Sequence, residues 1–534
     1  MKKNFMVSLS KSKKVKYSTI NLAFIAIVIA IVAVINSIIY VVAEKYNWYI
    51  DMTDEQVFSL SDESKELISE IGESVKLEIV FPSDREEIVN SYERTSQRGA
   101  WSYVHETAEQ IAQVSKNITI SYHDAVKDYE FYKSTGIMTA ERRTVIEDSV
   151  VILRKNDDGT YNSSDFRIYP LNYFFVGDEN NNLYGYNGEV VFMNALVSIS
   201  RDVTPTVYFT IKHGEKSFLK ELSTDFSAVT FSNFFSVYYA GIINEDAASL
   251  MQTLCESGME IKPIDLALEE IPDDARAIFI NSPSMDFSSE ETEKIDEYVK
   301  RKGTVFCFTS YDAKLPNLYS YLESEWGVKI IENSGTPVRD VNTSFGQDVN
   351  ALRANIVDST ASRSYFNSLT NYSSARAKVK NTAAVTILPK FANEDDGFFD
   401  GSGARSTNKI LETPSTAEYN GTKGTYTIMT ISAREDRSDQ KSEYSYFVFC
   451  PNDTLFSNQY MDSTDAPNRN ILLSIVQNTT KVQTLLNINT KVFKTYTIDM
   501  SDKEARVSTV MLALILPSII TVCGIVVIVR RKRR

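Results

Sequence analysis

The chain has 534 residues, of which 43% are hydrophobic and 24% are charged, and its formal net charge is −14. This length predicts two or three domains with sizeable cores. The acidic balance excludes nucleic acid as an expected partner, because a negatively charged body repels a phosphate backbone.

The basic residues gather at the two ends of the chain. Residues 1–43 hold six Lys and no acidic residue, and residues 507–534 hold five Lys or Arg and no acidic residue. Without these eleven residues, the rest of the chain carries 45 basic and 70 acidic side chains, a net charge of −25. Each basic end flanks a long apolar run, which is typical of membrane segments with cytoplasmic flanks.

These two apolar runs predict transmembrane helices. Leu22–Ala43 has 22 residues, enough at ~1.5 Å per residue to cross a hydrocarbon core of ~30 Å, and we expect a helix over residues 18–43. The alternative is a cleaved signal peptide, but the run exceeds the usual apolar region of ~7–15 residues. Val507–Val529 is the second run. We therefore expect a two-pass protein of the cell (plasma) membrane, with cytoplasmic tails at 1–17 and 530–534 and an extracytoplasmic acidic body.

Residues 54–203 predict a thioredoxin-like α/β domain. Strands and helices follow one another in the order βαβαββ, beginning with the apolar strand Val75–Phe81. Thiol redox chemistry requires a Cys-x-x-Cys motif, and residues 54–200 contain no Cys. His105 and His123 are separate in the sequence, whereas a metal site needs several converging ligands. We therefore expect neither thiol chemistry nor a metal in this domain.

Residues 204–500 predict a doubly wound α/β domain of the flavodoxin or glutamine-amidotransferase type, with a loop insertion near 391–424. The clearest unit runs from the apolar strand Ala275–Asn281 through one helix to the apolar strand Thr304–Thr309. Such a βαβ crossover joins parallel strands. We therefore expect a parallel sheet that helices cover.

The helix inside this βαβ unit has clear signals at both ends. Ser288 and Glu291 have the spacing of a capping box, in which each side chain accepts the other residue's backbone N–H. Lys300 lies in the last turn, and Gly303 follows it. We expect Gly303 to take the left-handed conformation that ends the helix.

Polar residues follow two strands of the second domain. His213 and Glu215 come after the strand Thr206–Ile211, and Asn281 and Ser282 end the strand of the βαβ unit. Open α/β sheets bind ligands at the carboxyl ends of their strands. These four residues are therefore our candidate rim of a ligand site. The alternative is a simple turn that the glycine between His213 and Glu215 permits.

Catalysis has little support in the sequence. A hydrolase of the amidotransferase type would need Cys307 as its nucleophile and His213 as its base, but Cys307 lies within the strand V-F-C-F-T-S without the flanking glycines of a nucleophile elbow. The chain also lacks the motif G-x-x-x-x-G-K-[ST], which cradles nucleotide phosphates. We therefore expect a protein that is not an enzyme, with no catalytic residue, no cofactor and no metal.

Several short motifs, weak singly, occur in an order that resembles a known family. Along the chain they are the first apolar run, Phe58-Ser59-Leu60-Ser61 before a V-x-L-x-x-x-F strand at 75–81, H-G-E at 213–215, I-P-D-D-A at 271–275, S-P at 282–283, S-x-E-E at 288–291, Y-V-K-R-K-G at 298–303, T-P-S at 413–415 and the basic C-terminal run. Over nearly its whole length, the chain resembles the auxiliary components of gliding-motility-type ABC transport systems, the GldG-like proteins. Lys302-Gly303 departs from that family, in which two glycines are frequent.

The resemblance implies a bacterial, non-catalytic, membrane-anchored auxiliary subunit that works beside separate ABC transporter permease and ATPase subunits. It does not imply motility. A second hypothesis is an extracytoplasmic ligand-binding or sensing module that uses the rim near His213 and Asn281. A hydrolase that uses Cys307 is the third.

Overall fold

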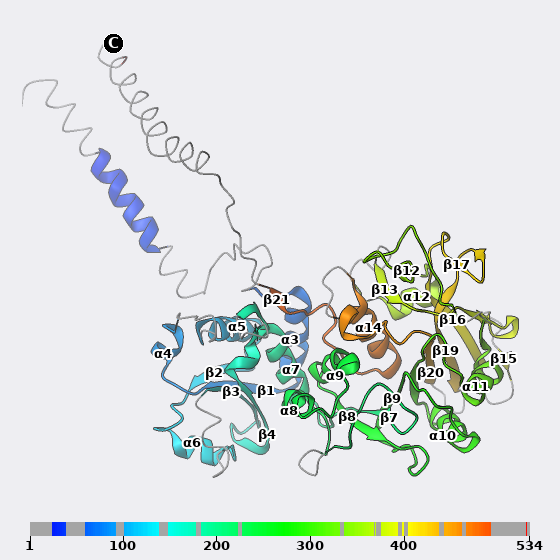
Figure 1. Cartoon of the computed structure of the whole chain (residues 1–534). Coiled ribbons are helices and arrows are strands. Elements are labelled where there is room, and N and C mark those ends of the chain that lie inside the picture. Colours follow the sequence, from blue (N-terminus) through cyan, green and yellow to red (C-terminus); the bar gives the residue numbers. More distant parts are fainter. Residues whose placement is uncertain are drawn as a thin grey trace, which may run out of the picture. The chain divides into compact units, whose positions relative to one another are not determined.

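The chain is a mixed α/β protein whose strands fall into two main sheets (Figure 1). By their internal contacts, Met1–Lys491 forms one compact unit and Val492–Arg534 a second one. The computed structural model describes residues 24–38, 59–91, 101–137, 148–177, 183–222, 227–331, 336–367, 369, 375–392, 398–399, 404–436, 443–461, 466–492 and 530.

The first sheet has four strands in the order β2-β1-β3-β4. β1 (Lys76–Phe81) pairs in parallel with β2 (Ile118–Tyr122) and antiparallel with β3 (Ser149–Lys155), which in turn pairs antiparallel with β4 (Tyr161–Pro170). Five consecutive residues of β1 are buried. Four of them are apolar, as expected for a strand covered on both faces, and the fifth, Glu78, is paired with Lys155 at 2.8 Å. The helices of this part are α3 (Asp62–Ser74), α4 (Arg85–Val89), α5 (Trp101–Val114), α6 (Tyr129–Ser134) and α7 (Gly188–Ser200).

The larger sheet is parallel over one half. Its main path has the order β13-β12-β16-β19-β20-β10-β9-β7-β8. Five strands of this sheet are parallel to one another: β8 (Glu260–Ile264), β7 (Thr206–Thr210), β9 (Ala275–Asn281), β10 (Thr304–Phe308) and β20 (Glu443–Cys450).

The other half of this sheet is antiparallel, which corrects the prediction of a doubly wound domain over residues 204–500. Its strands are β19 (Thr427–Asp436), β16 (Ala404–Glu412), β12 (Ala351–Ile356) and β13 (Arg376–Lys380). The connection from β19 to β20 is too short for the helical crossover that parallel strands need, so the chain turns back as a hairpin. β16 also lies inside the stretch 391–424, for which the sequence suggested a loop insertion.

The remaining elements are short strands and the helices of the larger sheet. The strands and 3-10 helices are η1 (Leu171–Phe174), β5 (Phe175–Gly177), β6 (Leu183–Tyr186), β11 (Val328–Ile330), β14 (Val385–Ile387), η3 (Pro389–Phe391), β15 (Phe398–Phe399), β17 (Glu418–Tyr419), β18 (Thr422–Lys423) and β21 (Lys491–Val492). The helices are α8 (Phe234–Tyr239), α9 (Glu245–Glu256), α10 (Ser289–Lys300), α11 (Pro316–Trp326), α12 (Thr360–Tyr365), α13 (Asn458–Met461) and α14 (Asn468–Thr480).

Apolar side chains cover both faces of the parallel half. On one face, Phe279 stacks between Phe209 and Phe306, with ring centroids 4.7 and 4.5 Å away. On the other face, Cys307 belongs to a core cluster with Ile295 of α10 and side chains of α11. Figure 1 shows α10 and α11 on one side of the sheet and α9 and α14 on the other. Burial on two faces explains why these strands are continuous apolar runs in the sequence.

The two ends of α10 test the cap predictions. The capping box is confirmed: the Ser288 hydroxyl accepts from Glu291 N at 3.2 Å, and Ser288 N donates to Glu291 Oε2 at 2.7 Å. The prediction for Gly303 is wrong, because Lys302 takes the left-handed conformation (φ 69°) instead. A glycine is required at position 303 for a steric reason, because a Cβ there would lie 2.4 Å from the Tyr298 ring.

The predicted membrane hairpin requires a correction. The structure describes a helix over residues 24–38 within the first predicted span. Among the described parts of the chain, no helix has the length and apolar character needed to cross a membrane. This finding contradicts the two-pass hairpin in the fold prediction, the integral membrane location, and the assignment of sides that depends on it. The second predicted span, 507–529, lies outside the described residues.

The division of the body between residues 203 and 204 stays a prediction, but the two sheets are joined by specific contacts. Asn194 of α7 is buried, and its Nδ2 donates to the carbonyls of Cys255 and Glu256 at 2.8 and 2.6 Å. Arg201 donates to Ser257 O at 3.0 Å, beyond the last turn of α9. Both side chains therefore bind carbonyls that the end of a helix leaves without partners.

Candidate functional site

The loops after β7 and β9 bring the four predicted rim residues to the same edge of the larger sheet. His213 and Glu215 follow β7, whereas Asn281 ends β9 and Ser282 follows it. Ser284 N donates to His213 O at 2.8 Å, which ties the two loops together. Ser282 has a φ of 56°, so the chain turns sharply where β9 ends.

His213 lies between two carboxylates. Its Nδ1 is 3.3 Å from Glu215 Oε1, and its Nε2 is 3.1 Å from Glu291 Oε1. The ring stacks on Phe287, with centroids 4.0 Å apart and planes at 18°. Backbone N–H groups hold the other carboxylate oxygens, since His213 N donates to Glu215 Oε2 at 2.7 Å and Ser288 N donates to Glu291 Oε2. We call these three side chains, His213, Glu215 and Glu291, the imidazole bridge.

The charges of the imidazole bridge stabilise one another. Burial alone would lower the pKa of His213, but the carboxylate of Glu215, 3.3 Å from Nδ1, and the carboxylate of Glu291 raise it above its ordinary value. Burial likewise opposes ionisation of Glu291, yet the Ser288 N–H and the charge of His213 lower its pKa. Both directions favour an imidazolium between two carboxylates, and all three residues are buried.

Asn281 and Ser282 also have partners within the protein. Asn281 Nδ2 donates to Lys216 O at 3.1 Å and to Ser217 Oγ at 3.2 Å. Ser282 Oγ donates to Asp453 Oδ2 at 3.2 Å, and Lys216 Nζ lies 2.7 Å from the same oxygen. The polar atoms at this edge are thus engaged in connections between neighbouring loops. Their role as a ligand rim stays a prediction.

Two residues of this edge escaped the sequence analysis. Glu291 was recognised only as a cap, although its second oxygen contacts His213. Asp453 follows β20, the strand next to β10 in the parallel half. The rule that pointed to His213 and Asn281, polar residues just after a parallel strand, would also have pointed to Asp453. The missing information was that β20 joins the parallel half.

The chemistry available at this edge is limited. Cys307 is fully buried in the core cluster on the α10 side of the sheet, and burial raises the pKa of its thiol. A buried neutral thiol is a poor nucleophile. We find no group of three or more His, Cys, Asp or Glu side chains that could hold a metal ion in the described parts of the chain.

His105 and His123 of the first sheet lie in different settings. His105 is buried, with Nε2 2.5 Å from the Tyr122 hydroxyl, and burial together with the charge of Arg85 lowers its pKa to about 4. His123 stacks on Phe131 at 3.6 Å between ring centroids. Each ring therefore has an aromatic or hydroxyl neighbour of its own, far along the chain from the imidazole bridge.

Comparisons with known proteins leave the family open. No protein-family model matches the chain, and no curated protein matches it. Among solved structures, the mmIFT52 N-terminal domain is 15% identical, with 52% of this chain and 97% of that chain covered and a TM-score of 0.33. The cytoplasmic protein STM3548 from Salmonella typhimurium is 11% identical, with coverages of 52% and 99% and a TM-score of 0.29. A ThuA-like protein from Parabacteroides merdae is 11% identical, with coverages of 55% and 93% and a TM-score of 0.27. Similarities this low carry no argument about this chain.

Proposed function

We propose that the chain is a non-catalytic auxiliary subunit of an ABC-type transport complex, which acts by binding separate permease and ATPase subunits. The observation that carries this proposal is the order of short motifs from Phe58-Ser59-Leu60-Ser61 to T-P-S at 413–415, which resembles the GldG-like components. The absence of a phosphate-binding G-x-x-x-x-G-K-[ST] from the sequence supports a role in which other chains supply the ATPase.

The places of two of these motifs support a non-catalytic role. H-G-E at 213–215 and S-x-E-E at 288–291 are far apart in the sequence, yet His213 of one motif contacts Glu291 of the other at 3.1 Å. Buried, mutually compensated charges of this kind fix the geometry of two loops. We infer that the motifs are retained as parts of the scaffold, and that partner binding uses other surfaces.

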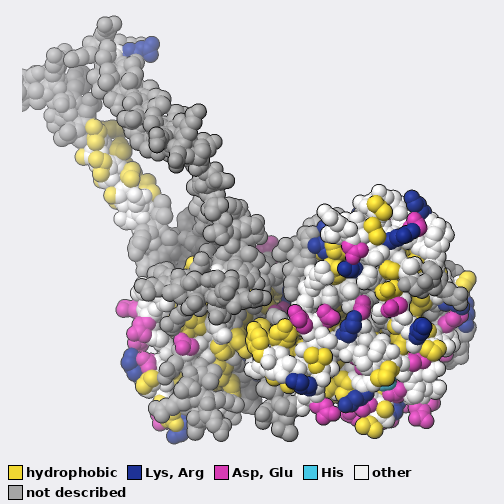
Figure 2. All heavy atoms as spheres, viewed as in Figure 1, with side chains coloured by type: hydrophobic (Ala, Val, Ile, Leu, Met, Phe, Trp, Pro, Cys, Tyr) yellow, Lys and Arg dark blue, Asp and Glu magenta, His cyan; other side chains and the backbone are white. Residues whose placement is uncertain are grey.

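An exposed apolar surface near α8 supports protein binding. Tyr239 is 80% exposed, and its ring stacks on Phe235, which in turn contacts the Tyr173 ring. Leu219 is 61% exposed and lies beside the end of α8, since its N–H donates to Ile242 O at 2.7 Å. Figure 2 shows hydrophobic side chains gathered over this part of the surface. We call Tyr173, Leu219, Phe235 and Tyr239 the aromatic patch, and aromatic side chains are enriched in protein interfaces.

Affinity purification tests the proposal. The tagged full-length chain is expressed in its source cells and purified in mild detergent, and the proteins that accompany it are identified by mass spectrometry. We expect an ABC ATPase and a multispan permease to be enriched with the wild-type chain. The double variant Phe235→Ser/Tyr239→Ser should recover them several-fold less. Leu268→Ser is the matched control, because Leu268 is 82% exposed outside the aromatic patch.

The outcomes are distinct. Recovery of neither ABC subunit with the wild-type chain would contradict the proposed function. Equal recovery with the wild-type chain and the double variant would exclude the aromatic patch as the contact surface. Loss of recovery with Leu268→Ser as well would indicate a general effect of the substitutions on the fold.

A further inference from the structure

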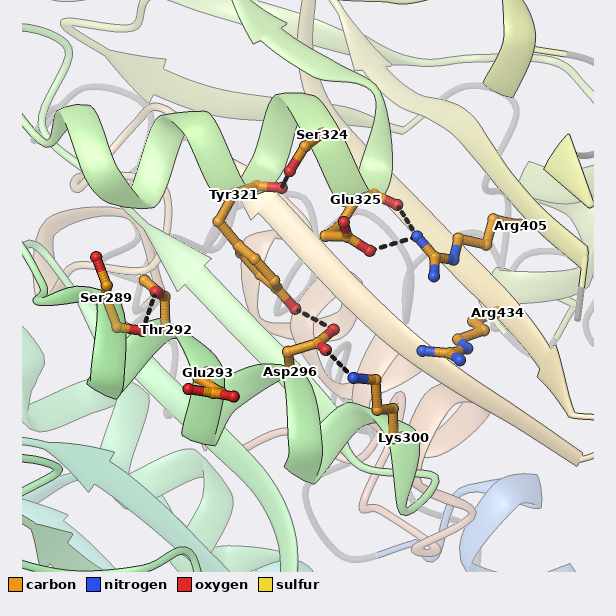
Figure 3. A pocket seen from close by; sticks show the side chains of 10 residues that line it. All are labelled: Ser289, Thr292, Glu293, Asp296, Lys300, Tyr321, Ser324, Glu325, Arg405 and Arg434. Carbon is orange, nitrogen blue, oxygen red and sulfur yellow. Dashed lines mark hydrogen bonds and ion pairs between the residues drawn. The ribbon is translucent and has the colours of Figure 1, made fainter. Parts of the chain in front are cut away.

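A cavity of about 650 Å³, largely open to solvent, lies between α10, α11 and the antiparallel strands β16 and β19. One face of α10 lines it from Ser289 to Lys300, and Tyr321 and Glu325 of α11 line the opposite side. Arg405 of β16 and Arg434 of β19 close one end (Figure 3). This volume falls within the range of ~300–1,000 Å³ that is typical of small-molecule sites.

The two arginines occupy directly opposite positions on neighbouring antiparallel strands. Arg405 pairs with Arg434 in the register of β16 and β19. Side chains in such a pair begin about 4.5–5.5 Å apart, and like charges there destabilise the sheet. A protein that keeps two buried guanidinium groups at this position needs negative charge beside each of them.

Only one of these two charges is neutralised by described residues. Arg405 forms an ion pair with Glu325 at 2.5 Å and also donates to Glu325 O at 3.2 Å. Arg434 is 9% exposed, and no carboxylate among the described residues forms an ion pair with it. In Figure 3 the Arg434 guanidinium points into the cavity. Its charge is therefore available to an anion bound in the cavity, which the guanidinium would hold through charge-assisted hydrogen bonds.

The rest of the lining limits the kind of anion. Lys300 is already paired with Asp296 at 2.6 Å, and the Tyr321 hydroxyl donates to the same carboxylate at 3.4 Å. Glu293 and Asp296 line the cavity along α10, so a second negative group on the ligand would meet repulsion there. Carboxylates do accept hydrogen bonds from hydroxyl groups.

We propose that this cavity binds a small hydroxylated organic anion, whose single phosphate or carboxylate group is held by the Arg434 guanidinium. Arginine binds both groups through paired N–H donors. From Ser289 to Lys300 the lining face of α10 extends about 16 Å, which leaves room for a hydroxylated body beyond the anionic group. The proposal is independent of the transport function, because it uses neither the aromatic patch nor the imidazole bridge.

Isothermal titration calorimetry of the full-length chain tests this site with four probes: glucose 6-phosphate, gluconate, glucose and inorganic phosphate. We expect glucose 6-phosphate or gluconate to bind, and the preferred one identifies the anionic group. Glucose and inorganic phosphate should each bind at least tenfold more weakly, because each lacks one of the two features.

Variants at the sheet edge link any binding to Arg434. Arg434→Met and Arg434→Gln should each weaken binding of the preferred probe at least tenfold, since both lose the charged donors. Lys409→Met removes an exposed cation from the same sheet, opposite Thr430, and should leave binding unchanged. Circular dichroism checks that each variant is folded.

The proposal is overturned if neither glucose 6-phosphate nor gluconate binds the wild-type chain, or if the Arg434 variants bind them as tightly as the wild type does. If glucose binds as tightly as glucose 6-phosphate, the anionic group does not contribute to binding. If inorganic phosphate binds as tightly as glucose 6-phosphate, the hydroxylated part of the ligand does not contribute to binding.

Discussion

The imidazole bridge and the arginine pair are two buried charged sites of the same sheet, and they differ in how their charges are balanced. In the imidazole bridge, His213 has a carboxylate on each side, and backbone N–H groups hold the remaining carboxylate oxygens. In the arginine pair, Arg405 has Glu325, whereas Arg434 faces a cavity. A site whose charges compensate one another holds the fold together, and a site with one uncompensated charge has capacity left for a ligand.

The largest expected effect on stability follows from removing the cation of the imidazole bridge. His213→Ala leaves Glu215 and Glu291 buried without a cation, with side chains 2% and 7% exposed. We expect the free energy of unfolding to fall by about 3–5 kcal/mol, measured by urea denaturation near neutral pH. His123→Ala is the control, because its side chain is 28% exposed and it faces one half-exposed carboxylate. If His213→Ala and His123→Ala lower the free energy of unfolding equally, the charges of the imidazole bridge do not compensate one another as proposed.

The next effect concerns the compensated member of the arginine pair. Arg405→Met leaves the Glu325 carboxylate and carbonyl without their buried donor, so we expect a loss of about 1–3 kcal/mol. Arg363→Met removes an arginine whose ion pair with Asp358 is largely exposed, and exposed pairs contribute about 0–1 kcal/mol. Urea denaturation of both variants measures the difference. A loss with Arg405→Met no larger than that with Arg363→Met would show that Glu325 does not compensate the buried charge.

A smaller effect is the pH dependence of the imidazole bridge. Because the pKa of His213 is raised in the folded chain, its contribution to the free energy of unfolding is complete below about pH 6.5. That contribution is lost as the pH rises through the folded-state pKa. The lowered pKa of Glu291 makes its contribution complete above about pH 4.3, with loss only in more acidic solution. The stability difference between the wild type and His213→Gln should therefore be larger at pH 5.5 than at pH 8.5.

His105 supplies a control of opposite sign for this pH dependence. Burial lowers its pKa to about 4, so the neutral ring is favoured in the folded chain and stability is lost as the pH falls from about 6.5. The difference between the wild type and His105→Gln should shrink from pH 8.5 to pH 5.5. If both histidines change in the same direction, the charge assignment of the imidazole bridge is wrong.

The smallest expected effect is a gain in stability in the variant Arg434→Met. Without ligand, Arg434→Met relieves the repulsion between directly opposite arginines, and we expect the free energy of unfolding to rise by about 0.2–1 kcal/mol at low salt. Screening by salt should reduce this gain. Lys409→Met on the neighbouring strand should have no such effect, because it faces Thr430. Destabilisation by Arg434→Met would indicate that Arg434 is already compensated, like Arg405.

Part of the fold and of the candidate site was accessible from the sequence because the signals are local. The order βαβαββ, the strands around Val75–Phe81 and Ala275–Asn281, and the capping box of Ser288 and Glu291 depend on residues a few positions apart. The same holds for the placement of His213 and Asn281 after strands. Apolar length alone was misleading, since the run at 22–43 predicted a membrane span, whereas no helix in the described parts of the chain has the length and apolar character to cross a membrane.

The sequence by itself determined the elements with a strong apolar pattern, such as β1, β9 and β10, and it determined the cap at the start of α10. It did not reveal β16, which lies in a polar stretch that reads as a loop. Only the tertiary structure decided that β19 and β16 turn antiparallel, that Glu291 reaches His213, and that Arg434 stands opposite Arg405. It also decided that Lys302 and not Gly303 takes the left-handed turn, because the Tyr298 ring occupies the space beside Gly303. The physical reason is range: caps and periodic burial act within a few residues, whereas the balance of a buried charge depends on which distant strand the fold places beside it.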